Sequence, residues 1–197
     1  MAKPKRQTYY GSGTIYEFTK PTTEGWTIPD TTADIKTFVE ANALDTNQIG
    51  FLKNGFQLAI TTETLTDQSD LGEMKIDVIT KEEAQITFAL FNSNGETLSR
   101  LYPTATTTSG VTTVGGLANA SQIDHVIMFV SANKNEDGEQ TVFIALGKNT
   151  SGFNINWNPD SVEPFSCQYT VVPFNTDGNL FRIADISGLP TLPRATQ

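Results

Sequence analysis

The chain carries a single histidine, His125, which is its most obvious candidate for acid–base chemistry. His125 follows Asp124, and an acid beside a histidine could support general-base catalysis. The surrounding residues are nearly all apolar, which indicates a strand, and neighbouring residues of a strand point to opposite faces. Asp124 and His125 would therefore not form a dyad. We predict that His125 is a hydrogen-bonded structural residue.

The single cysteine, Cys167, is the only candidate thiol nucleophile. It alternates with polar residues in a strand pattern, so we interpret it as a small core residue, and no plausible base accompanies it. One Cys and one His are too few for a structural zinc site, and a lone Cys forms no internal disulfide. Because no Walker, Rossmann or nucleophile-elbow motif is found, we predict no enzyme, no cofactor and no metal ligand.

Carboxylates gather in the first half of the chain, at Glu63, Asp67, Asp70, Glu73 and Asp77. The simplest interpretation is a solvated hairpin tip. A calcium loop fits less well, because only part of an EF-hand pattern is present and flanking helices are missing. A third interpretation is the acidic wall of a channel that repels DNA phosphates. A second acidic group, Glu136-Asp137-Gly138-Glu139, is more simply an exposed turn.

The net charge of −9 bears on possible partners. A protein that grips nucleic acid needs Lys and Arg to displace counterions, so this charge argues against a gripping DNA binder. It does not argue against a protein past which DNA slides without sticking. Trp26 and Trp157 lie in loop-like segments, and we interpret them as core plugs or interface anchors.

A mainly β framework must position these residues. Thr, Asn, Ser and Gly are abundant, as in strands joined by many turns. Alternating apolar residues predict strands near 9–18, 55–64, 74–78, 84–90, 123–130, 140–146, 165–174 and 180–183. The Asp137-Gly138 pair predicts a hairpin turn. Short helices are expected at 34–43, capped by Thr32 or Asp34, and at 94–103, ended by Pro103. Residues 104–122 are expected to form a flexible loop.

The domain organisation follows from this pattern. We expect a flexible N-terminal arm over residues 1–8, one domain over 9–187 and a flexible C-terminal arm over 188–197. The basic start is not followed by an apolar stretch, so no secretory signal is expected. No run approaches ~18 apolar residues, so no membrane partner is expected.

Three segments, in order, resemble the tail tube (major tail) protein family of long-tailed bacteriophages. They are GSGTIY at 11–16, IGFLKNGFQLAITTET at 49–64, and the strand at 82–90 followed by the short helix at 96–101. The resemblance is one of arrangement over roughly residues 9–185. It implies an all-β dominated, β-sandwich or barrel-like tail tube fold with one or two short flanking helices, although the helix at 34–43 is less typical of the family.

The resemblance also implies a structural virion protein of the phage tail, made in the host cytoplasm. Its subunits would form hexameric rings that stack into a hollow conduit for the genome, and the five clustered acids would be candidates to face the lumen. Implied partners are further copies of the chain, the tape-measure, baseplate or tail-tip and tail terminator proteins, and double-stranded DNA that passes without specific binding. Two alternatives stay open. One is the tube protein of a contractile injection system. The other is a carbohydrate-binding or adhesin-like module, in which Trp157 between Asn156 and Asn158 could stack on a sugar.

Overall fold

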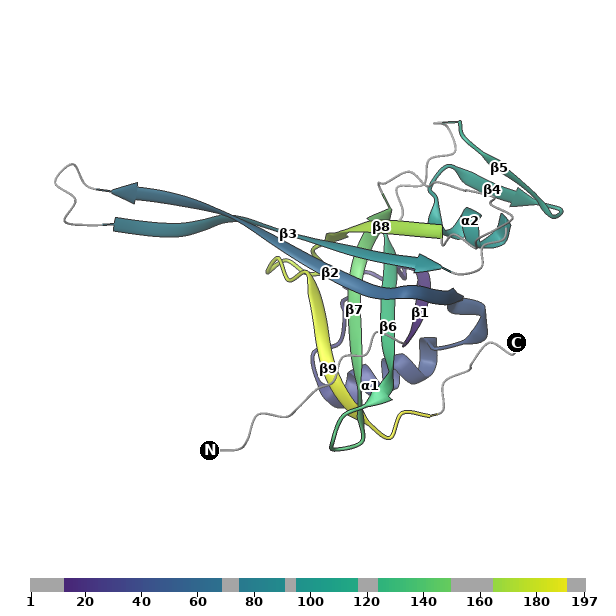
Figure 1. The fold of residues 1–197 in the computed structure, drawn as a ribbon, viewed down its shortest axis with the longest axis horizontal. Coiled ribbons are helices and arrows are strands. Elements are labelled where there is room, and N and C mark those ends of the chain that lie inside the picture. The colour runs from purple at the N-terminus through teal and green to yellow at the C-terminus, as the bar shows by residue number, and fades with distance from the viewer. Residues whose placement is uncertain (1–12, 69–74, 91–94, 117–123, 150–164, 191–197) are drawn as a thin grey trace.

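The computed structural model describes residues 13–68, 75–90, 95–116, 124–149 and 165–190. Antiparallel strands dominate, as the sequence predicted, with two short helices beside them (Figure 1). The strands are β1 (Gly13–Thr19), β2 (Gln48–Gln68), β3 (Lys75–Leu90), β4 (Ala105–Thr108), β5 (Val111–Val114), β6 (His125–Lys134), β7 (Glu139–Asn149), β8 (Phe165–Val172) and β9 (Phe181–Ser187). The helices are α1 (Thr32–Asn42), α2 (Gly95–Leu101) and the single 3-10 turn η1 (Asp45–Asn47).

Six of the strands close a ring of antiparallel pairings in the order β6-β1-β2-β3-β8-β7, because β7 also pairs with β6. β7 pairs with β8 through its last residues and with β9 along the rest of the same edge. Gly13 of β1 packs tightly against β6, and a Cβ added there would clash with the Phe129 ring. Closure of the ring removes most free strand edges, and β9 remains as an edge strand.

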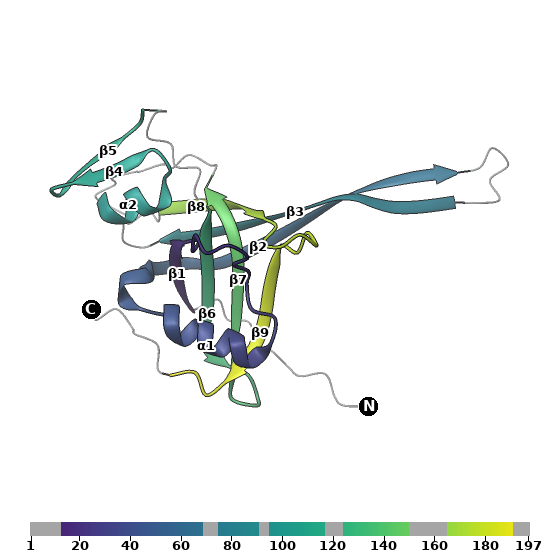
Figure 2. The same ribbon diagram turned by 180° about the vertical axis from the view of Figure 1, so that it is seen from behind.

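The interior of the ring holds one hydrophobic core, in which Phe88 stacks on Tyr169 and the Phe56 ring packs on Phe129. A second core lies outside the ring, where Ile35 and Val39 of α1 meet strands β6, β7 and β9 (Figure 2). β1 faces both cores, with Ile15 in the first and Tyr16 in the second. Adjacent strand residues point to opposite sides, so this strand is apolar on both faces.

Strands β2 and β3 extend far beyond the ring as a two-stranded ribbon, visible in both Figures 1 and 2. β3 pairs with β8 only from Gln85 to Leu90, so its first half pairs with β2 alone. We call residues 61–68 and 75–83 the projecting hairpin. A bulge at Thr80, opposite Glu63 and Thr64, interrupts its register. A bulge increases local twist, and the ribbon is twisted in Figure 1.

The helices and the β6–β7 hairpin agree with the sequence prediction, with a correction at one cap. Thr31, rather than Thr32 or Asp34, caps α1, and its hydroxyl oxygen accepts the Asp34 N–H at 3.1 Å. The sequence does not distinguish Thr31 from Thr32 and Asp34, because Thr and Asp are both favoured at the N-cap position. The expected turn joins β6 to β7, with Gly138 at φ +78°.

Two expectations about loops are corrected. The segment 104–122 was predicted to be a flexible loop, yet β4 and β5 form a hairpin in it, with Thr107 and Thr112 joined by a hydroxyl hydrogen bond. Its threonines suit strands but give no apolar alternation to reveal them. At the C-terminal end, Leu189 was assigned to an arm, but its side chain is buried in the second core.

Candidate functional site

The projecting hairpin carries the acidic residues that the sequence analysis singled out. Glu63 and Asp67 lie on β2 and Asp77 on β3, whereas Asp70 and Glu73 lie outside the described residues. Lysines accompany these acids: Lys81 contacts Glu63 at 3.6 Å and Glu83 at 2.7 Å, and Lys75 contacts Asp77 at 3.2 Å. The hydrogen bond to Glu83 raises the pKa of Lys81. Hydrogen bonds from the Thr66 hydroxyl and, to a smaller extent, from Lys75 lower the pKa of Asp77.

The register separates these acids onto two faces. Glu63 pairs with Lys81 and Asp67 with Ile76, whereas Asp77 pairs with Thr66. Directly paired residues share a face and successive residues alternate. Glu63 and Asp67 therefore point to one side of the ribbon and Asp77 to the other. The described acids cannot all line one surface, which the clustering along the sequence did not reveal.

Exposed apolar side chains also divide between the faces. Leu65 pairs with Val78, and Ile76 pairs with Asp67, which lies on the same side of β2 as Leu65. We call Leu65, Ile76 and Val78 the apolar face. These three side chains are 61%, 51% and 50% exposed. The opposite face carries Thr62, Thr64 and Thr66, and we call it the threonine face. The apolar face belongs to a ribbon that stands away from the folded body, where no second sheet covers it in the described residues (Figures 1 and 2).

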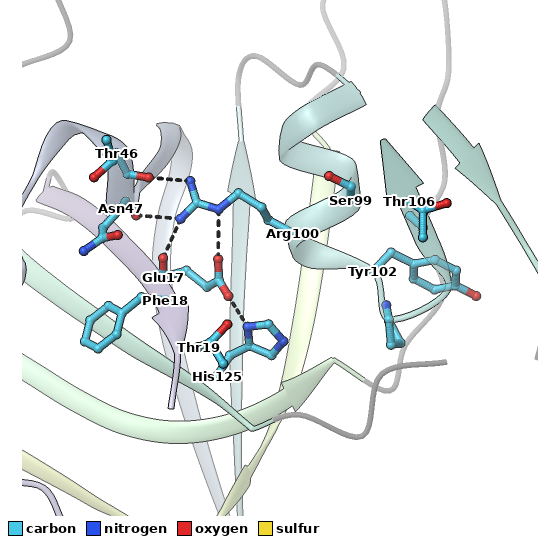
Figure 3. A pocket seen from close by; sticks show the side chains of 12 residues that line it. Glu17, Phe18, Thr19, Thr46, Asn47, Ser99, Arg100, Tyr102, Thr106 and His125 are labelled. Carbon is cyan, nitrogen blue, oxygen red and sulfur yellow. Dashed lines mark hydrogen bonds and ion pairs between the residues drawn. The ribbon is translucent and has the colours of Figure 1, made fainter. Parts of the chain in front are cut away.

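A second polar arrangement is buried in the body, around Glu17 of β1 (Figure 3). The Glu17 side chain is only 2% exposed. Its carboxylate accepts from Arg100 Nε at 3.3 Å and binds Nδ1 of His125. Arg100 also donates to the carbonyl oxygens of Glu17, Thr46 and Asn47 at 2.5, 2.8 and 3.3 Å. This network joins β1, η1, α2 and β6.

The network explains how a carboxylate is tolerated inside an apolar framework. A buried charge is costly unless it is paired and hydrogen-bonded, and each Glu17 oxygen has its own partner. The hydrogen bond predicted for His125 is confirmed, with Glu17 as its partner. Asp124 instead contacts Lys148 at 3.2 Å.

A pocket of about 500 Å³ borders this network, and Ser99, Tyr102 and Thr106 also line it. An acid–imidazole pair can orient a histidine as a base for a hydroxyl nucleophile. In Figure 3, however, Ser99 lies on α2 away from the imidazole, with Arg100 between them. The hydrogen bonds of the arrangement therefore fasten four elements together.

The remaining predicted residues occupy ordinary positions. Cys167 is buried in the ring interior, and burial raises the pKa of its thiol to about 12, which agrees with a core role. Trp26 is half-buried against Phe38 beside the second core, and Trp157 lies outside the described residues. Glu136 and Asp137 are exposed in the β6–β7 turn.

Two general features bear on the kind of site. In the described residues, no group of three His, Cys, Asp or Glu side chains is arranged to hold a metal ion. The same residues include no helix long and apolar enough to cross a membrane. Compared with models of known protein families and with curated proteins, the sequence matches none.

The Glu17–Arg100–His125 network was missed by sequence reasoning because its members lie 83 and 108 residues apart. The available signal was Glu17 itself, a charged residue between apolar neighbours in a strand that is otherwise buried on both faces. The apolar face was missed because Ile76 and Val78 lie on the opposite side of β3 from Ile79, and only the pairing with β2 brings Leu65 beside them.

Proposed function

We propose that this chain is the subunit of a phage tail tube, in which copies assemble as hexameric rings stacked into a hollow conduit for DNA. The single observation that carries this proposal is the projecting hairpin with its uncovered apolar face. A two-stranded ribbon is marginally stable alone in water, and three large apolar side chains on it are exposed. A second copy of the chain would cover them, as an assembling protein requires.

The two faces of the hairpin support different roles in that assembly. The apolar face packs against a neighbouring copy, and Glu63 and Asp67 lie at the rim of the contact. The threonine face carries Asp77, Glu82 and Lys75, together with Thr62, Thr64, Thr66 and the exposed Ile79. Such a face suits a wall along which DNA moves, because its described carboxylates outnumber its lysine, which is paired with Asp77, and hydroxyls bear no positive charge. Asp77 is therefore our candidate for the lumen.

The experiment that tests this function changes the apolar face without touching the body. Leu65→Thr combined with Val78→Thr places a β-branched residue at both positions, which suits strands, while removing apolar surface. We expect the double variant to remain folded and to lose most of its self-association, measured by light scattering across a concentration series. Both side chains are at least half exposed, so the free subunit's stability should change by less than about 0.5 kcal/mol each.

The matched control is Val111→Thr on β5, which removes a similarly exposed apolar side chain away from the hairpin. It should assemble as the unaltered chain does. Undiminished association of the hairpin double variant would show that the apolar face is not the contact, and equal loss in the control would show that the effect is not specific to the hairpin.

A further inference from the structure

A pocket of about 670 Å³ lies between the loop before α1 and the turn that joins β8 to β9. Trp26 and Asp30 line it from the loop, and Phe174, Asp177 and Arg182 line it from the other side. Its volume falls within the range of about 300–1,000 Å³ that is typical of small-molecule sites. The pocket is separate from the projecting hairpin and from the Glu17 network.

Arg182 is the most informative residue of this pocket. Its guanidinium carbon lies 5.2 Å from the centre of the Phe174 ring, a cation–π contact that fixes the orientation of the group. Its Nε is buried and, within the described part of the chain, has no hydrogen-bond partner. An unsatisfied buried donor costs about 1–3 kcal/mol. Arg182 also lines the pocket, where a ligand oxygen could accept from its other guanidinium N–H groups.

The other lining residues indicate what kind of acceptor fits. Two carboxylates, Asp30 and Asp177, line the pocket together with one guanidinium, so the local charge disfavours an anionic ligand. Asn175 already donates its amide to Asp177 at 3.3 Å, which holds that carboxylate at the pocket. The half-buried Trp26 adds an aromatic surface, which suits a ligand with both apolar and polar faces.

From this combination we propose that the pocket binds a neutral carbohydrate. Sugar hydroxyls can donate to Asp30 and Asp177 and accept from Arg182, while the C–H face of a pyranose ring packs on the indole of Trp26. The site goes beyond the proposed tube function and does not depend on it. On an assembled tube it would give the subunit a weak affinity for surface glycans.

The two tryptophans make the proposal directly testable by NMR. The full-length, nitrogen-15-labelled chain at a concentration that keeps it unassembled is titrated with maltose, lactose and diacetylchitobiose in turn. With at least one of these sugars, we expect the indole N–H signal that disappears in Trp26→Phe to shift and saturate at millimolar concentration, at about −4 kcal/mol of binding free energy. The Trp157 signal should stay in place.

Arg182→Gln should weaken the binding about tenfold, because it removes a charge-assisted hydrogen bond. Asp30→Asn, at an exposed position that tolerates change, should weaken it as well, which keeps the test valid if Arg182→Gln does not fold. Asp137→Asn in the distant β6–β7 turn is the control and should bind normally. No saturable shift with any of the three sugars, or an affinity in both pocket variants equal to that of the unaltered chain, would overturn the proposal. A stronger response to glucuronate than to the neutral sugars would overturn it too.

Discussion

At the scale of single residues, the most informative feature is the buried carboxylate of Glu17 and the groups that pair with it. Glu17 is nearly inaccessible, yet its two oxygens bind Arg100 and His125 from different elements. Arg100 in turn satisfies carbonyl groups of β1 and η1. Breaking a buried pair by removing one partner leaves a desolvated charge without compensation.

The first prediction follows from that imbalance. Glu17→Ala removes both acceptor oxygens and leaves the Arg100 guanidinium without its carboxylate. We expect the free energy of unfolding, measured by urea denaturation, to fall by about 3 kcal/mol. Glu63→Ala, which breaks the exposed pair with Lys81, should change it by less than about 0.5 kcal/mol. Similar losses in the two variants would mean that Glu17 does not hold the elements together.

The second prediction concerns Cys167. Burial raises the pKa of its thiol from 9.0 to about 12, so the folded state favours the neutral form. This contribution to stability is complete below pH 9 and is lost as the pH rises from 9 towards 12. At pH 10 the loss should be about 1.4 kcal/mol. Urea denaturation at pH 8 and 10 should show this loss in the unaltered chain beyond any change in Cys167→Ala. Equal pH dependence of the two would contradict a buried, protected thiol.

At the scale of elements, the sequence predicted the strands and turns that a short stretch of residues encodes by itself. Alternation revealed the strands around Phe56, Ile86 and Cys167, and Asp137-Gly138 revealed the β6–β7 turn. The β4–β5 hairpin was not predicted, because its threonines give no apolar alternation: Thr106, Thr107, Thr112 and Thr113. The two faces of the projecting hairpin depend on a bulge and a register that no single strand encodes, and the Glu17 network depends on tertiary contacts across the chain.

The third prediction tests the β6–β7 turn. Gly138 has φ +78°, which residues with a side chain adopt only at a cost, while nothing lies within 4 Å of an added Cβ. Gly138→Ala should therefore lower the free energy of unfolding by about 1 kcal/mol through backbone strain alone, without a steric clash. Thermal denaturation provides the measurement, and Glu136→Ala in the same exposed turn is the control. An unchanged melting temperature for Gly138→Ala would contradict the turn geometry.

At the scale of the whole molecule, a closed ring of six strands forms a stable body, whereas the projecting hairpin exposes what a monomer would normally hide. Within the described ranges, β9 lies at the edge of the large sheet, and the hairpin reaches well away from the ring (Figure 1). In the proposed function, the closed ring would fold first and the projecting hairpin would then pack against a neighbouring copy.

The most direct test of this account is electron microscopy of the purified chain at rising concentration. We expect hollow tubes or rings with sixfold symmetry, in which the apolar face of Leu65, Ile76 and Val78 is covered by a neighbouring copy and Asp77 faces the lumen. A protein that stays a monodisperse monomer at every concentration, with or without a preformed ring to initiate assembly, would contradict the tail tube proposal.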